Sequence, residues 1–179
     1  NTMHRDLLLN KITNILGDTD DSLEATLVSM CDDAKRIFIT GAGRSKLVGN
    51  FLGMRLMHSG YEVFVQGEIS TPSIREGDLL IVISGSGETT QLVSFTNKAK
   101  SEGAKVVLIC SKASSTIGDL ADQTIQVGSN DSFAPTKGMP MGTMFELSTL
   151  IFLEAMVSHL IHERGIAEEE MRHRHANME

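Results

Sequence analysis

Residues 79–90 read Leu-Leu-Ile-Val-Ile-Ser-Gly-Ser-Gly-Glu-Thr-Thr, and this stretch decides the fold. Its first five residues are apolar without alternation, which is typical of a parallel strand buried on both faces. A hydroxyl-rich turn follows at 84–87, and residues 88–100 have the apolar spacing of a helix. Backbone N–H groups in the first turn of a helix point outward and bind anions, so this turn is a candidate phosphate site. The same residues also suit a simple chain reversal in which Ser86 or Thr89 caps the helix.

The same order of strand, polar turn and helix occurs twice more. Residues 36–40 predict a strand, followed by Gly-Ala-Gly-Arg-Ser at 41–45 and an apolar helical run. Residues 105–110 predict another strand, followed by a polar turn and a short helix at 116–121. The carboxyl ends of parallel strands meet at one edge of a sheet, where open α/β folds bind their ligands. The repetition therefore favours a binding role for these turns and predicts an α/β fold.

The remaining segments complete one predicted domain over residues 1–179. Helices are expected within 3–35, the α/β core within 36–127, and further helices with a tail within 140–179. Additional strands are expected at 61–65 and 123–127, the latter nearer the sheet edge because it alternates. The loop that follows, up to about residue 140, is rich in Gly, Ser, Asn, Asp and Pro, and its length suggests mobility or a ligand role.

Composition argues against several classes of function. The 179 residues are 41% hydrophobic with a formal net charge of −7, so we expect one globular domain and no nucleic-acid partner. Cys31 and Cys110 are interpreted as small buried hydrophobes, and the histidines lack the compact spacing of a metal site. No apolar run approaches the roughly 20 residues that span a bilayer, and the N-terminus lacks a signal-peptide core. These features predict a cytoplasmic protein without a membrane partner.

Two further groups are candidates for chemistry. Glu146 lies near the start of an apolar helical segment, where a carboxylate either complements the helix dipole or serves as a general base. Near the end of the chain, His173 and His175 alternate with arginines. This segment is either a solvated terminus or the source of a proton-transfer group and a charge for a phosphate-bearing site.

Six segments together resemble the sugar isomerase (SIS) domain proteins: residues 41–45, 54–58, 77–80, 84–89, 140–146 and 174–179. The Ser-Gly-Ser-Gly-Glu-Thr turn is specific for that superfamily only. The Met-Gly-Thr-Met-Phe-Glu segment and the Arg-His-Ala-Asn-Met-Glu ending are similar to the 6-phospho-3-hexuloisomerase family. The resemblance implies a flavodoxin-like three-layer α/β/α sandwich with a five-stranded parallel sheet, and a homotetramer. It also implies interconversion of D-arabino-3-hexulose 6-phosphate and D-fructose 6-phosphate, after formaldehyde fixation in the ribulose monophosphate pathway, with no cofactor and no metal.

The resemblance also implies roles for individual residues. Glu146 matches the family's proton acceptor, which would transfer a proton between adjacent carbons through an enediolate. His175 is assigned to proton shuttling at the hydroxyls or to ring handling, reaching into a neighbouring subunit's site. The phosphorylated ketohexose is expected to contact Arg44, Ser45, Ser84, Gly85, Ser86, Gly87, Glu88 and Thr89.

Three alternatives for the function remain open. Gly41 and Gly43 suit dinucleotide binding, but Lys46 stands where the third glycine is required. A non-catalytic sugar-phosphate sensor is the second alternative, and another SIS isomerase acting on arabinose 5-phosphate or sedoheptulose 7-phosphate is the third. Lys46 also departs from the family pattern; we interpret it as exposed on its helix, with phosphate attraction as the alternative. His58 is interpreted as a satisfied packing residue.

Overall fold

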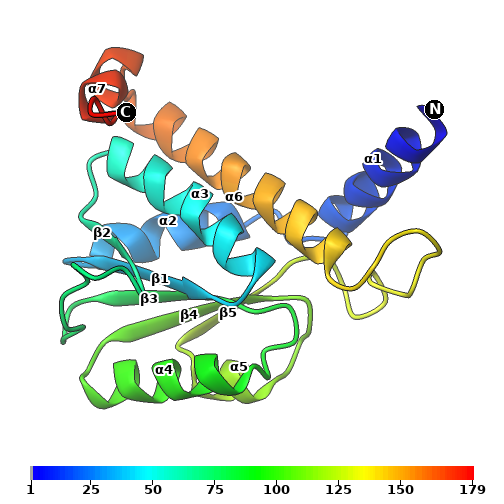
Figure 1. The fold of residues 1–179 in the computed structure, drawn as a ribbon, viewed down its shortest axis with the longest axis horizontal. Coiled ribbons are helices and arrows are strands. Elements are labelled where there is room, and N and C mark those ends of the chain that lie inside the picture. The colour runs from blue at the N-terminus through cyan, green and yellow to red at the C-terminus, as the bar shows by residue number, and fades with distance from the viewer. Residues whose placement is uncertain (1) are drawn as a thin grey trace.

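One parallel sheet organises the chain. The computed structural model describes residues 2–179; Asn1, which the predicted domain includes, lies outside the described residues. The strands are β1 (Ile37–Gly41), β2 (Val63–Val65), β3 (Leu79–Ile83), β4 (Lys105–Cys110) and β5 (Gln123–Gln126). They pair in parallel in the order β2-β1-β3-β4-β5 (Figure 1). The predicted five-stranded parallel sheet is confirmed, with β5 at an edge and β1, β3 and β4 as neighbours at the centre.

Helices cover both faces of the sheet. Below it in Figure 1 lie α4 (Thr90–Ser101) and α5 (Thr116–Leu120). Above it lie α2 (Leu23–Asp33), α3 (Arg44–His58) and α6 (Thr143–Arg164). α1 (Thr2–Gly17) extends outward near the start of α6, whereas α7 (Glu168–Arg174) lies at the other end of that helix. The predicted three-layer α/β/α sandwich is confirmed.

Each face of the sheet has its own apolar core because side chains alternate along a strand. Ile39 and Ile81 belong to the core on the α3 and α6 side, whereas Phe38 and Leu80 belong to the core under α4. All five residues of β3 are buried, which agrees with its unbroken apolar sequence and its central place. Burial on both faces therefore holds the polar turn after β3 in a fixed position at the sheet edge.

α6 differs from the expectation that no segment is apolar enough to span a bilayer. By length and composition, it is the one helix in residues 2–179 that meets this test. It packs instead against α1, α2 and α3. Phe152, Met156 and Leu160 along it are buried in the core next to the sheet. The apolar character of α6 therefore reflects its place as a core helix.

Candidate active site

The turn after β3 is shaped by its own hydroxyl groups. Ser84 is buried, and its Oγ accepts a hydrogen bond of 3.0 Å from the Gly87 amide. The Oγ of Ser86 accepts from the Glu88 amide at 3.1 Å. Gly87 has a φ of 67°, and a Cβ at this position would lie only 2.2 Å from the Ser115 hydroxyl oxygen. The turn thus has a defined shape that requires glycine at residue 87.

Helix capping does not account for this turn. Thr89 is the N-cap residue of α4, but its side chain makes no capping hydrogen bond. Its Oγ1 lies 3.4 Å from the Ser84 hydroxyl instead. The predicted helix also begins two residues later than expected, at Thr90, because Glu88 turns aside and accepts hydrogen bonds from the amide and hydroxyl of Thr116. The first turn of α4 therefore presents its N–H groups without a threonine cap, which suits an anion.

Glu88 connects the turn to α5. Its bonds to the Thr116 side chain and backbone lower the pKa of the Glu88 carboxyl, so it is ionised at neutral pH. On the neighbouring strand end, the hydroxyl of Ser111 donates to the Gly85 carbonyl at 2.7 Å. Two sides of the turn are thus fixed by the segment that follows β4. Glu88, which we predicted as a substrate contact, makes a structural contact here.

Arg44 and Glu146 meet across a sequence separation of 102 residues. Arg44 opens α3 and Glu146 lies in the first turn of α6, and the Arg44 guanidinium donates from Nε to a Glu146 carboxylate oxygen. The Glu146 side chain is 13% exposed, whereas Arg44 is 63% exposed. The arginine therefore remains accessible to a ligand while its partner is largely enclosed. Phe145, the residue before Glu146, packs against Gly85, so the start of α6 lies over the turn after β3.

His175 does not join this group within one chain. Its ring stacks on His58 with 5.1 Å between ring centroids, at the C-terminal end of α3. Since α3 rises about 1.5 Å per residue, this end lies about 20 Å from Arg44 along the helix. The sequence left two interpretations of the tail, a solvated terminus or part of a site. In the structure, the tail forms α7 and contacts α3.

His58 corrects one prediction. It is buried, as expected of a packing residue, but its Nε2 has no hydrogen-bond partner among residues 2–179. Its Nδ1 lies 3.3 Å from an Arg55 guanidinium nitrogen. Burial lowers the pKa of His58, and the nearby His175 and Arg55 lower it further. The expectation of a fully satisfied histidine is therefore wrong, because α3 and the tail offer no acceptor to Nε2.

Residues 30–152 match the family model of the SIS domain. The chain belongs to the SIS domain family. A protein of Methylomonas aminofaciens named 3-hexulose-6-phosphate isomerase is 51% identical over 178 residues, 98% of each chain. The protein of the same name from Bacillus subtilis is 36% identical and aligns over 96% of this chain and 95% of its own. A crystal structure from Methanococcus jannaschii, for which that function was inferred, has a TM-score of 0.88 at 34% identity and covers 99% of both chains.

Lys46 lies beside the candidate site of this SIS domain. It is half-buried rather than exposed, and its Nζ lies 3.0 Å from where a Cβ on Gly67 would be. Ser45, also half-buried, precedes it in the first turn of α3. The positive charge of Lys46 thus faces the segment after β2, at the same edge of the sheet as Arg44.

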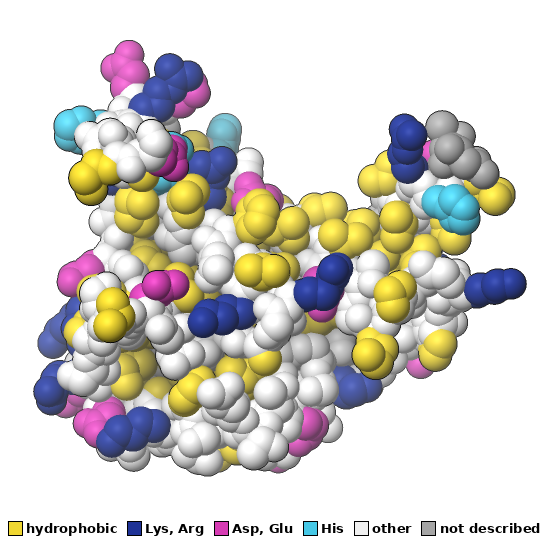
Figure 2. Space-filling view, viewed as in Figure 1, with side chains coloured by type: hydrophobic (Ala, Val, Ile, Leu, Met, Phe, Trp, Pro, Cys, Tyr) yellow, Lys and Arg dark blue, Asp and Glu magenta, His cyan; other side chains and the backbone are white. Residues whose placement is uncertain are grey.

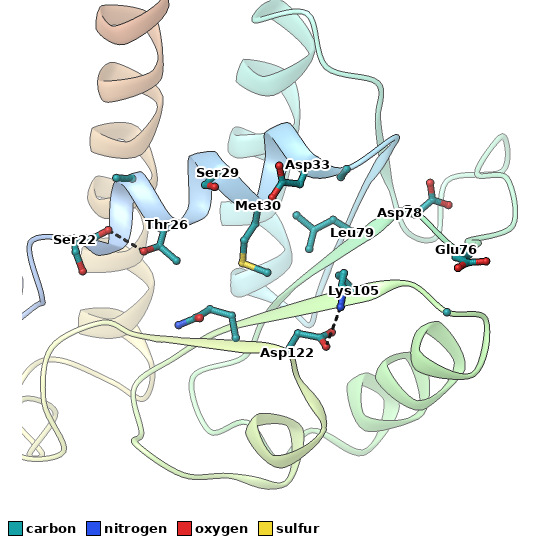
Figure 3. A pocket seen from close by; sticks show the side chains of 15 residues that line it. Ser22, Thr26, Ser29, Met30, Asp33, Glu76, Asp78, Leu79, Lys105 and Asp122 are labelled. Carbon is teal, nitrogen blue, oxygen red and sulfur yellow. Dashed lines mark hydrogen bonds and ion pairs between the residues drawn. The ribbon is translucent and has the colours of Figure 1, made fainter.

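A large cavity lies elsewhere in the SIS domain. It has a volume of about 990 Å³ and lies at the amino ends of the strands, where Leu79 and Lys105 begin β3 and β4. Figure 3 shows Met30 and Asp33 of α2 above it, with Asp122 paired to Lys105 below. None of the predicted site residues lines this cavity.

No three or more His, Cys, Asp or Glu side chains within residues 2–179 form a group that could hold a metal ion. Cys31 and Cys110 are both free and buried, in agreement with their interpretation as small hydrophobes. The polar groups that the SIS domain gathers at the carboxyl edge include hydroxyls, backbone amides, the cations of Arg44 and Lys46, and the carboxylates of Glu88 and Glu146. This set of groups suits an anionic, hydroxylated ligand.

Proposed function

We propose that this SIS domain protein is a 6-phospho-3-hexuloisomerase, which interconverts D-arabino-3-hexulose 6-phosphate and D-fructose 6-phosphate. The observation that carries the proposal is the 51% identity, over 98% of both chains, to a protein named for this activity. Formation of the Arg44–Glu146 pair beside the turn after β3 supports it. We also propose that the whole chain is one SIS domain and that it acts in the cytoplasm. Its reaction would follow formaldehyde fixation in the same pathway.

Glu146 is the proposed base. It removes the proton from C2 of the 3-hexulose, the bonding electrons form a C2–C3 double bond, and negative charge develops on O3. The carbon proton then returns to C3, and His175 transfers the O2 proton to O3. The carbonyl moves to C2, and O3 becomes a hydroxyl group. No electrons leave the sugar, and the step needs no redox cofactor. Arg44 holds the Glu146 carboxylate in place and stabilises the enediolate charge.

The turn at 84–89 is the proposed phosphate site. Its serine and threonine hydroxyls and the first N–H groups of α4 converge at the carboxyl end of β3. Phosphate oxygens accept hydrogen bonds from such groups, and the N-terminus of a helix favours negative charge. Ser45 and Arg44 contact the sugar from the first turn of α3.

His175 is the proposed group for transferring the hydroxyl protons. Its Nδ1 lies 2.9 Å from the Ala176 carbonyl oxygen; because a carbonyl only accepts, Nδ1 carries the proton. Nε2 then has a free lone pair, and the side chain is 47% exposed. Since this residue lies at the far end of α3 from Glu146, we propose that it serves the site of a neighbouring subunit.

An apolar stripe on α3 supports this sharing of sites. Leu47, Phe51 and Met54 are exposed and occupy one face of the helix. Ile151 is exposed on α6, which packs against α3. Figure 2 shows hydrophobic side chains gathered over α3 and α6. Phe51 is the middle residue of α3, so two copies that pack antiparallel about it place the C-terminal end of one α3 beside Arg44 of the other. Leu7 and Leu9 are exposed on different sides of α1, and we assign them to further apolar contacts in a homotetramer.

The test of the chemistry is turnover of fructose 6-phosphate by Glu146→Gln. Loss of a general base lowers kcat by about a thousandfold, whereas the control Glu163→Gln, at the exposed end of α6, retains wild-type turnover. Near-normal turnover by Glu146→Gln would refute the assigned base. Binding of fructose 6-phosphate by the wild-type protein without conversion would favour the sensor alternative.

The test of shared sites uses two inactive variants. Glu146→Gln and His175→Asn chains are denatured together and refolded as mixed oligomers. Half of the resulting subunit pairs contain one chain of each variant. In such a pair, one of the two shared sites combines the intact Glu146 of one chain with the intact His175 of the other. Mixing therefore restores about a quarter of wild-type activity. Absence of any recovery would show that each site uses Glu146 and His175 of the same chain.

A further inference from the structure

The C-terminal segment makes two contacts with His58 at the end of α3. The Arg174 guanidinium donates from Nη1 to the His58 carbonyl at 2.9 Å. The next residue, His175, stacks its ring on the His58 ring with an interplanar angle of 26°. Both contacts converge on His58, so this single residue supports the part of the tail that carries the proposed proton-transfer group.

Burial of the His58 side chain costs free energy, and a role in packing alone does not explain why a histidine stands at this position. Its side chain is enclosed, with 2% of the residue exposed. Arg55 only donates hydrogen bonds, so the Nδ1 of His58 that faces it is an acceptor and the proton lies on Nε2. That buried N–H has no acceptor within the described chain, a state that destabilises the fold and that leucine would avoid.

A flat ring at residue 58 has an effect that an aliphatic side chain lacks. Planar rings favour stacked arrangements at the separation seen here, which restricts the orientation of His175. The burial of His58 also keeps it uncharged at neutral pH, so it does not repel a protonated His175. The neutral ring can therefore remain stacked when His175 gains its proton.

We infer that His58 is the positioning residue for His175: its ring and carbonyl fix the tail so that His175 is presented in one orientation. This inference rests on the proposed role of His175 in proton transfer. His58 itself touches no substrate. It acts through the stacked ring and through the Arg174 hydrogen bond.

The test compares His58→Leu with His58→Phe, using kcat and KM for fructose 6-phosphate. Leucine removes the stacked ring, and we expect kcat to fall about tenfold while KM stays within about twofold, since the phosphate site is untouched. Phenylalanine keeps a flat ring without the buried nitrogens, and we expect it to retain kcat within about threefold. His162→Leu, at an exposed position in the last turn of α6, is the matched control and keeps wild-type kinetics.

Arg174→Met provides an independent variant if His58→Leu fails to fold. Arg174 is exposed, so its loss leaves the core intact while the bond to the His58 carbonyl disappears, and we expect the same selective fall in kcat. If His58→Leu folds and keeps the wild-type kcat, the inference is overturned. If only Arg174→Met folds, a wild-type kcat in that variant overturns it. Full activity of His175→Asn also overturns it, because the tail then carries no catalytic group. An inactive wild-type protein instead refutes the proposed function and is recognised before any variant is compared.

Discussion

Replacement of Gly87 by alanine tests the shape of the turn after β3. Gly87 has a φ of 67°, and a side chain in this left-handed region costs about 1–2 kcal/mol. The new Cβ would also lie 2.2 Å from the hydroxyl oxygen of Ser115, which must move. That hydroxyl accepts a hydrogen bond from the Gly118 amide and caps α5, so its displacement costs about 1 kcal/mol more. The sum of about 2–3 kcal/mol lowers Tm by roughly 4–12 °C in a protein of this size.

The assay for Gly87→Ala pairs thermal melting with the KM for fructose 6-phosphate. We expect KM to rise several-fold, because the backbone amides of the proposed phosphate site are displaced together with Ser115. Gly165→Ala is the matched control: Gly165 also has a positive φ, of 59°, but no atom lies within 4 Å of its Cβ position. This control carries the backbone strain alone, at the end of α6, and leaves KM unchanged. Equal Tm and equal KM for the two variants would refute the account of the turn.

Removal of Arg36 is expected to lower the free energy of unfolding by about 3 kcal/mol, because its guanidinium is the bidentate partner of the buried Asp78 carboxylate; urea denaturation measures it. The native protein is expected to react slowly with a thiol reagent near neutral pH, because burial raises the pKa of Cys31 to about 12 and also raises the pKa of Cys110. Stability is expected to fall as the pH drops below 6.5, because the lowered pKa of His58 lets the unfolded chain bind a proton that the folded chain does not; melting curves of wild type and His58→Phe measure this slope.

Each of these three expectations has a contrary outcome. Lys98→Ala breaks an exposed pair between Lys98 of α4 and Glu102, the residue that caps this helix, and serves as the control for Arg36. An equal effect of the two substitutions on the free energy of unfolding contradicts the importance of the buried Arg36–Asp78 pair. Two fast-reacting thiols in the native protein contradict the burial of the cysteines. If the loss of stability below pH 6.5 is the same in the wild type and in His58→Phe, it does not come from the His58 side chain.

Local pattern is sufficient to predict most of the fold, because each strand carries its own signal. The unbroken apolar run of β3 requires burial on both faces, and that burial is available only at the centre of a parallel sheet. The alternation at 123–127 indicates an edge, where β5 lies. The turns after β1, β3 and β4 come together because these strands are neighbours, so three copies of one motif predict a common edge.

Contacts between distant segments are beyond such patterns. The pairing of Arg44 with Glu146 depends on α3 and α6 lying side by side, which neither helix sequence specifies. The docking of the tail depends on the hydrogen bond from Arg174 to the backbone carbonyl of His58. Because every residue has a backbone carbonyl, the sequence does not indicate which one Arg174 binds. The apolar flank around His58 predicts its burial, but the fate of its ring nitrogens depends on neighbours brought by the fold.

The most direct test of the central claim is an NMR measurement of the purified protein with fructose 6-phosphate in deuterated water, without added metal or nucleotide. Proton abstraction by Glu146 at one carbon and return to the next predicts the appearance of a 3-hexulose 6-phosphate with solvent deuterium at C2 or C3 of the sugars. Fructose 6-phosphate that binds but gains neither a 3-keto product nor deuterium would contradict the isomerase and favour the sensor.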